Sequence, residues 1–425
     1  MQSNEIRALV TQLLPAERLQ ALADELGVFT RQRKVHLAPL VWILVLGPLT
    51  SPRCSWAHLH RLYLTAVGGS LSRSSFYERL NEPLAALMAL LLQYALRNAR
   101  KQAGHFAQYF QHFDKVLALD SSVVALRDGL HQAFESCQKA KSALKLHATI
   151  NVLDFRLYRV SLSDQTTSDL TGFKHVKSWC KNKLLLFDLG YYRFSSFAAI
   201  DEAGGYFLSR AKTSLNVKIV ADHPSGAGAY ISMAGLRVKK ALKRLQRKQV
   251  DWDVLLTWKE QGELKSAQVR LVGVFNEETK RYHLYLTNLP RATYPADELA
   301  QMYRARWGVE LLFKQLKSDG HLDVQTSAKE HLVRLRIDAL LLGYELTGRL
   351  CALYQKRKPE RRYPVSRGLR ALSALVPHLL AQLCEPWANP IDLDDLFERM
   401  CIDPNVFRSR PSDPFLRTSS LALSP

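Results

Sequence analysis

KVLALD (residues 115–120) and KLLLFD (residues 183–188) are apolar runs that each finish on an aspartate. Strands buried inside a mixed sheet carry such continuous apolar runs, and the functional groups of open α/β sheets gather beyond the carboxyl ends of the strands. We therefore expect two neighbouring strands that end at Asp120 and Asp188 and bring both carboxylates to one cation site. A single aspartate after an apolar run is also typical of a turn or a helix cap. The pair becomes informative only with a third ligand.

Further β-rich runs surround these two segments. ALKLHATINVL (143–153) and FRLYRVSL (155–162) meet at the turn former Asp154 and are typical of a hairpin. Residues 167–180 have the pattern of a crossover helix that leads into the second aspartate run. Strand, hairpin, helix and strand together predict a mixed sheet of the α/β class. A further strand pattern, GYFLSRAK (205–212), comes next along the chain. The patterns after it predict a β-rich insertion at about residues 213–290; they are WDVLLTW (252–258), SAQVRLVGVF (266–275) and RYHLYLTNL (281–289).

Helical periodicity lies on both sides of this region. Residues 1–105 show it almost throughout, with prolines as breaks, and predict a helical N-terminal domain. Residues 106–350 hold the sheet and its insertion, and a helical pattern resumes near Pro295. Residues 351–425 predict a helical, basic C-terminal region with a frayed end.

The charge balance points to a polyanionic partner. Lys and Arg number 59 against 39 Asp and Glu, which gives a formal net charge of +20 and a pI near 9.7. Nucleic acid is the leading interpretation, although ribosome-associated and membrane-surface proteins share this balance. The hydrophobic fraction of 47% and the charged fraction of 23% are those of globular proteins and argue against disordered, collagen-like and coiled-coil classes.

Cysteine usage and the apolar segments favour an intracellular protein. The six cysteines form no CxxC pair, which argues against a zinc knuckle and a disulfide framework. The N-terminus MQSNEIRALVTQLLP lacks a secretory pattern. The longest apolar runs fall short of the roughly 18 residues needed to cross a bilayer. We expect a cytoplasmic protein with no membrane partner.

A candidate third carboxylate lies in YRARWGVELLFKQLK (303–317). On one continuous helix, Tyr303, Arg306, Glu310 and Lys317 project within an arc of about 60°. An apolar stripe suited to docking on a sheet takes the opposite side; it comprises Ala305, Val309, Leu312, Phe313 and Leu316. The same letters also fit a solvated helix face on which Arg306 and Glu310 form an i,i+4 ion pair.

The spacing of these four residues resembles the YREK signature of cut-and-paste DDE transposases of the insertion-sequence-four type. LALDSS (117–122) resembles the strand with the first aspartate of that family, and LLLFDLGYY (184–192) the strand with the second. YFLSRAK and YLTNL (285–289) resemble its insertion and the segment before the signature. The resemblance covers about residues 115–317. Ser121 and Ser122 stand where relatives more often have Gly or Thr, and they keep a small polar side chain.

The resemblance implies an RNase H-like fold in which Asp120, Asp188 and Glu310 form the catalytic, metal-binding triad. It implies two Mg²⁺ ions about 4 Å apart, which activate the nucleophile and stabilise the leaving oxygen of a phosphodiester. Mn²⁺ is an expected substitute, because carboxylate oxygens suit all such hard cations. Residues 1–105 are then expected to bind DNA, residues 106–350 to form the catalytic domain, and residues 351–425 to support dimerisation.

The same resemblance suggests how DNA is held. Tyr303, Arg306 and Lys317 are expected to grip phosphates near the transposon end. Because the family passes through a DNA hairpin, an extruded base needs a stacking partner, and Trp307 is the candidate. Trp252 and Trp258 are alternatives, and all three also suit packing roles. Arg210 and Lys212 are expected to contact phosphate, with a generic surface role as the alternative.

The expected partners are double-stranded DNA with terminal inverted repeats, target DNA and a second copy of the chain, in the bacterial cytoplasm near the nucleoid. Two alternatives stay open. An RNase H-like nuclease that cuts without strand transfer needs the same carboxylates but no grip on a transposon end. A catalytically silent, transposase-derived DNA-binding protein needs none of them.

Overall fold

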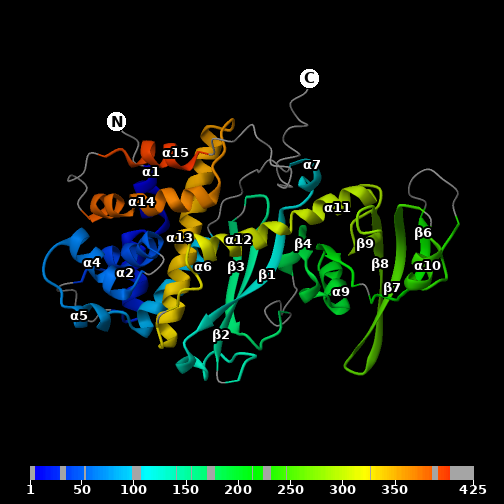
Figure 1. Cartoon of the computed structure of the whole chain (residues 1–425), viewed down its shortest axis with the longest axis horizontal. Coiled ribbons are helices and arrows are strands. Elements are labelled where there is room, and N and C mark those ends of the chain that lie inside the picture. Colours follow the sequence, from blue (N-terminus) through cyan, green and yellow to red (C-terminus); the bar gives the residue numbers. More distant parts are fainter. Residues whose placement is uncertain are drawn as a thin grey trace.

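The computed structural model describes residues 5–28, 35–51, 54–97, 107–139, 141–154, 156–169, 178–212, 214–223, 231–245, 247–325, 327–384 and 391–402. A helical head lies at one end and a long sheet extends away from it (Figure 1). No helix within these ranges combines the length and apolar content needed to cross a bilayer.

The head is built from short amphipathic helices around one fully apolar helix. α3 reads LAPLVWILVL and is buried on nearly every side, so the other helices can pack around it. The helices of this part are α1 (Glu5–Leu13), α2 (Ala16–Glu25), α3 (Leu37–Leu46), α4 (Trp56–Val67), α5 (Arg73–Glu78), α6 (Glu82–Arg97) and the short α7 (Ala107–Phe110). The prediction of a helical N-terminal part is confirmed.

Within the described ranges, nine strands form one mixed sheet in the order β3-β2-β1-β4-β5-β9-β8-β7-β6. They are β1 (Lys115–Leu126), β2 (Ser142–Asn151), β3 (Arg156–Asp164), β4 (Lys183–Phe187), β5 (Tyr206–Arg210), β6 (Lys218–His223), β7 (Gln249–Glu260), β8 (Glu263–Asn276) and β9 (Arg281–Thr287). β1, β4 and β5 run parallel to one another, and every other pair of neighbours is antiparallel. The order and directions of the first five strands are those expected of an RNase H-like sheet.

Helices cover both faces of the sheet. The buried residues of α11 (Ala296–Arg304) and α12 (Trp307–Ser318) share one core with the head and with the near faces of β1 and β2. α9 (Phe194–Glu202) and α10 (Val238–Arg244) pack in a second core on the other face. The long α13 (Glu330–Arg357) then returns along the head and is followed by α14 (Val365–Cys384) and α15 (Leu393–Cys401) (Figure 1).

Three details differ from the sequence-based expectations or extend them. The strand expected to end at Asp120 continues to Leu126, because Ser121 to Leu126 stay paired with β2 after the parallel pairing with β4 ends at Ala118. The β-rich segment within 213–290 extends the main sheet, since β9 pairs with β5. The boundary placed at residue 350 falls inside α13. Most of the expected crossover helix, residues 170–177, lies outside the described residues.

Candidate functional site

The first aspartate lies where β1 loses one of its neighbours. β1 pairs with β4 only from Lys115 to Ala118, so the edge of β1 that begins at Leu119 has no strand partner on that side among the described residues. Side chains alternate along a strand, and Asp120 therefore projects on the same side as Val116 and Ala118, which pack in the core with α12. The backbone N–H of Ser121 donates to Asp120 Oδ1 at 2.8 Å. The carboxylate is thus held at an open sheet edge.

The second aspartate follows the last residue of β4. Asp188 caps the short 3-10 helix η4 (Leu189–Tyr191), and its Oδ1 accepts a hydrogen bond from the Leu189 N–H at 2.7 Å. By strand alternation Asp188 lies on the side of Leu184 and Leu186, which belong to the same core as α12. Asp120 and Asp188 therefore leave adjacent strands toward the same face.

The signature segment is two helices rather than the one helix expected from its periodicity. α11 ends at Arg304, and α12 begins at Trp307. Both intervening residues keep right-handed helical torsions, but Ala305 and Arg306 donate to the carbonyls of Met302 and Tyr303, three residues back. Such a tightened turn rotates the following helix relative to an ideal α-helix. The apolar stripe still docks, since Ala305, Val309, Leu312, Phe313 and Leu316 are all buried.

Arg306 pairs with two of the three carboxylates. Its guanidinium pairs with Glu310 one turn later and has Nη1 3.7 Å from Asp120 Oδ2. Burial, with the Asp188 and Glu310 charges adding to it, raises the pKa of Asp120 to about 6 despite the opposing effects of the Ser121 N–H and Arg306. Asp120, Asp188 and Glu310 are therefore within electrostatic reach of one another.

The carboxylates are not drawn together into a ready metal cage. Within the described ranges, no group of three or more His, Cys, Asp or Glu side chains has the geometry to hold a metal ion. Arg306 supplies a physical reason, because its guanidinium lies against Asp120 and Glu310 and offsets their repulsion. The donor set itself fits Mg²⁺, since it consists of carboxylate oxygens on neighbouring elements. A rotation of the Arg306 side chain would open the space between them.

The remaining predicted DNA contacts surround this cluster. The Tyr303 hydroxyl donates to the carbonyl of Phe187, beside Asp188, at 3.0 Å. Lys317 Nζ donates to the Val123 carbonyl on the open edge of β1 at 3.2 Å. Arg210 ends β5 and is exposed beside Tyr285, its partner on β9. Lys212 is exposed with its Nζ 5.2 Å from the centre of the Tyr192 ring. All four basic or phenolic groups lie on elements that adjoin the carboxylates.

The three candidate tryptophans differ sharply in exposure. Trp307, at the start of α12, is 51% exposed and directly follows Arg306. Trp252 is fully buried in the core beneath β7, so it has no face available for a nucleobase. Trp258 is half-buried near the β7–β8 turn. Exposure therefore favours Trp307, and the alternative of Trp252 is wrong.

A fourth carboxylate, Asp169, lies behind the site, and no sequence motif predicts it. Asp169 Oδ1 accepts from Ser121 Oγ at 2.7 Å and lies 3.4 Å from Lys145 Nζ. A Cβ at Gly190 would be 3.1 Å from Asp169 Oδ2, so this carboxylate also reaches the turn after Asp188. Its contacts come from separate strands, and no local spacing reveals them. Asp169 ties together the residues that follow both aspartates.

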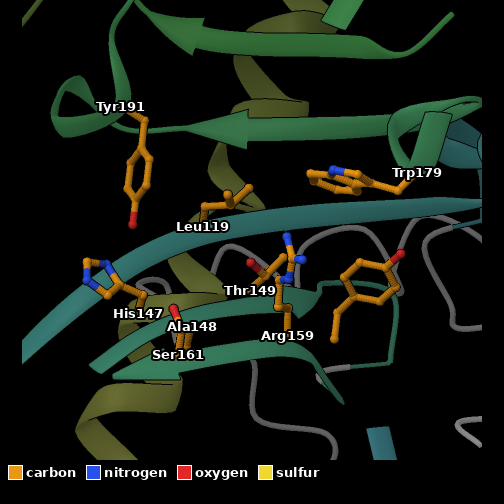
Figure 2. Close-up of a pocket in the computed structure, with 9 residues that line it drawn as sticks. Leu119, His147, Ala148, Thr149, Arg159, Ser161, Trp179 and Tyr191 are labelled. Atoms are coloured by element: carbon orange, nitrogen blue, oxygen red, sulfur yellow. The ribbon is translucent and has the colours of Figure 1, made fainter. Parts of the chain in front are cut away.

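A small cavity adjoins this cluster on the face of β1 and β2 away from α12. His147 and Tyr191 line one end of it beside Leu119, and Trp179 and Arg159 line the other (Figure 2). The Tyr191 hydroxyl is directed toward the strands (Figure 2). Burial, together with the Asp169, Asp120 and Asp188 charges, raises the pKa of Tyr191, so the phenol stays protonated.

The chain is similar in sequence to known transposases. A protein-family model described as the Transposase DDE domain matches residues 111–346. The transposase for insertion sequence element IS231F of Bacillus thuringiensis subsp. israelensis is 24% identical over 408 residues, which are 84% of this chain and 83% of the relative. The putative transposase InsL for insertion sequence element IS186A of Escherichia coli (strain K12) is 41% identical over 74 residues, which are 17% of this chain and 20% of that relative.

Among solved structures, the piggyBac transposase in a synaptic complex with hairpin DNA superposes with a TM-score of 0.44 and 9% identity, over 95% of this chain and 84% of that one. The matched family region contains Asp120, Asp188 and the whole 303–317 segment. The resemblance to transposases of the insertion-sequence-four type is confirmed. The chain belongs to the DDE transposase family and is a transposase enzyme.

Proposed function

We propose that Asp120, Asp188 and Glu310 hold two Mg²⁺ ions with which the protein cuts at the ends of its element and joins them to target DNA. The observation that carries this proposal is the pairing of Asp120 on β1 and Glu310 on α12 with the single guanidinium of Arg306, while the charge of Asp188 acts on both Asp120 and Arg306. Like charges gathered in a partly exposed cluster around one buried guanidinium are costly to maintain unless a metal cation is part of the working state of the cluster.

The protein's own groups account for orientation of the carboxylates. The N–H groups of Ser121 and Leu189 each bind one oxygen of the preceding aspartate, which leaves the other oxygen available as a ligand. Divalent metal bound there supplies the activation of water or a 3′-hydroxyl and the stabilisation of the leaving oxygen. Mn²⁺ takes the same oxygen ligands and is expected to substitute.

Five cationic or phenolic side chains are proposed to position the DNA. Arg306 is suited to a bidentate phosphate contact, and Tyr303, Lys317, Arg210 and Lys212 surround it. Trp307 is proposed to stack on a base extruded during hairpin formation, because its indole is half exposed beside Arg306. The proposed setting is the bacterial cytoplasm near the nucleoid, with two copies on paired terminal inverted repeats. In this scheme residues 1–105 bind DNA and residues 351–425 support dimerisation.

The direct test uses labelled duplexes that carry the terminal repeats flanking this reading frame, with Mg²⁺ or Mn²⁺. The wild-type protein is expected to yield hairpin and strand-transfer products, and Asp188→Ala neither. Glu263→Ala, on the exposed β7–β8 turn, is the matched control and should retain both products. Nicking without end specificity would favour a simple nuclease. Tight binding without cleavage by the wild type would favour a silent DNA-binding descendant.

Lys317 offers a separate test of the DNA path. The Lys317→Ala variant is expected to weaken DNA binding and to reduce the slope of log K against log salt by about one unit, because one phosphate contact releases about one counterion. Fluorescence anisotropy over a salt series measures this slope. An unchanged slope would contradict the assigned phosphate contact.

A further inference from the structure

The α10 region is the most basic short stretch of the described chain outside the signature segment. Residues 237–248 contain seven Lys or Arg and no Asp or Glu. Across residues 205–290 the totals are fifteen basic and seven acidic, so this part of the sheet carries a strong share of the net charge. None of residues 237–248 belongs to the carboxylate site or to its proposed DNA contacts.

α10 is docked so that its charges face outward. Val238 and Ala241 are fully buried in the same core as Val250 and Trp252 of β7. The remaining turn positions, Lys239, Lys240, Lys243 and Arg244, are exposed; we call these four the α10 basic face. From Lys239 to Arg244 the helix rises about 7.5 Å. The four cations are therefore presented together on one short, anchored element.

Neighbouring charges leave the α10 basic face uncompensated. Arg247 is paired with Asp222, and Lys248 Nζ lies 2.5 Å from Glu277 Oε1. Farther along the same strands, Lys265 pairs with Glu260, and Arg270 with Asp251. Among the residues that the structure describes, no carboxylate lies within ion-pair distance of the α10 basic face. Five of the seven acidic residues of 205–290, namely Asp222, Asp251, Asp253, Glu260 and Glu277, are paired with other cations.

The place of α10 in the sheet separates it from the carboxylate site. It packs over β7 at the end of the sheet remote from the head (Figure 1). Four strand spacings separate β4 from β7, which is about 19 Å at roughly 4.8 Å per spacing. That is the length of about six base pairs of duplex. α10 also packs on the opposite face of the sheet from α12, so its cations are separate from Arg306 and Lys317.

We propose that the α10 basic face binds the phosphates of duplex DNA outside the cleavage position, without reading sequence. This inference rests on the proposed function and adds a second DNA-contact surface to it. Duplex DNA carries one charge per about 1.7 Å of axis, so the 7.5 Å rise of the face spans about four phosphate charges, as many as its cations. An anionic membrane is a poorer partner, because the apolar side of α10 is buried and none of it is free to insert.

The test compares two four-site variants with the wild type, using fluorescence anisotropy in EDTA so that no DNA is cut. Lys239→Gln, Lys240→Gln, Lys243→Gln and Arg244→Gln together remove the charge. The matched control, Lys239→Arg, Lys240→Arg, Lys243→Arg and Arg244→Lys, preserves it. The charge-removed variant is expected to lose more than about tenfold in affinity and about three to four units of salt slope, and the control to match the wild type.

Two arms distinguish the source of the duplex. The first experiment uses end-bearing duplexes with flanks of 2 to 20 base pairs. If α10 contacts the flank, the charge-removed variant binds more weakly than the wild type only when the flank is longer than about six base pairs. In the second experiment, a duplex without terminal repeats is added to protein that is already bound to an end-bearing duplex without a flank. If α10 contacts target DNA, the charge-removed variant does not bind this second duplex. Either loss supports the proposal.

The proposal would be overturned if the charge-removed variant kept the wild-type affinity and salt slope in both experiments. It would also be overturned if this variant bound DNA like the wild type but no longer bound phosphatidylserine vesicles. Failure of the proposed function is seen separately, as product formation by Asp188→Ala on a trimmed duplex.

Discussion

At the scale of single residues, Arg306 is the group on which the site's electrostatics depend. Its guanidinium contacts two carboxylates and is itself largely buried. Metal and guanidinium thus compete for the same oxygens. If phosphate binding draws Arg306 away from the carboxylates, bound DNA raises the affinity for metal. By linkage, bound metal then raises the affinity for DNA by the same factor.

Arg306→Gln is predicted to raise the Mn²⁺ affinity of the DNA-free protein on the order of tenfold, because a charge-assisted hydrogen bond contributes about 1.5 to 3 kcal/mol. The same change should weaken binding to end-bearing duplex. Electron paramagnetic resonance of free Mn²⁺ measures the first effect without any cutting. Arg306→Lys keeps the charge and is the control; equal Mn²⁺ affinity in all three proteins would contradict the competition.

Ser121 is predicted to position Asp120 through its neighbour Asp169. Ser121→Ala removes the hydroxyl that donates a hydrogen bond to Asp169. Ser121→Thr keeps a hydroxyl, on a residue type that is common in strands. Ser121→Ala should raise the Mg²⁺ concentration needed for half-maximal cutting, with an unfolding midpoint near that of the wild type. Ser121→Thr should restore the wild-type requirement. A loss of stability without a change in Mg²⁺ requirement would show a purely structural role.

At the scale of elements, the short helix α11 is fixed by a buried ion pair at its entry. Arg270 on β8 holds Asp251 on β7 through two hydrogen bonds of 2.9 and 2.6 Å, and its Nη1 donates to the Tyr294 carbonyl at 2.8 Å, just before α11. The insertion is thereby connected to the segment that carries Arg306. The ion pair therefore resists movement of the insertion relative to the segment that carries Arg306.

Asp251→Asn is predicted to cost about 3 to 5 kcal/mol in the free energy of unfolding, because it leaves Arg270 buried with no opposite charge. Urea denaturation followed by circular dichroism measures the loss. Lys265→Gln, which breaks the exposed pair with Glu260 on the same hairpin, is the control and should change stability by no more than about 1 kcal/mol. Similar losses in both variants would contradict the importance of burial.

The elements also show what sequence patterns can and cannot predict. The runs before Asp120 and Asp188 were predictable because buried strands need unbroken apolar side chains. The continuation of β1 past Asp120 depends on pairing with β2, and the break at Ala305 and Arg306 involves neither Pro nor Gly. Asp169 reaches Ser121 from 48 positions away. Local periodicity carries no information about such long-range contacts.

At the scale of the whole molecule, the head and the catalytic sheet are held by one continuous core. Buried residues from α1 to α6, from β1 and β2 and from α12 to α15 belong to the same cluster. A buried charged contact reinforces the junction, where Arg156 of β3 pairs with Glu345 of α13 and Arg349 reaches the Ala95 carbonyl. We therefore expect unfolding to be cooperative across this junction.

The pH dependence of global stability is predicted to include a contribution from Asp338, in the first third of α13. Burial raises its pKa from 3.8 to about 7, with Arg334 opposing. A carboxyl group with a raised folded-state pKa stabilises the fold below its unfolded pKa, and that stability is lost as pH rises through about 4 to 7. The loss is on the order of 4 kcal/mol for three pKa units.

Urea unfolding between pH 4.5 and 8 tests this directly. Asp338→Asn should flatten the fall in the free energy of unfolding and be more stable than the wild type at pH 8. Asp128→Asn, at an exposed position, should follow the wild-type curve. Parallel curves for the wild type and Asp338→Asn would contradict the assignment.

The shared core limits how this transposase can be re-engineered. A head grafted from another element must fill the same space against α13 and β3, because the contact is an interior rather than a detachable surface. Retargeting by exchange of whole heads is therefore expected to yield insoluble chimeras, whereas recombination that keeps the interior side chains and alters only solvent-facing positions should leave the scaffold intact.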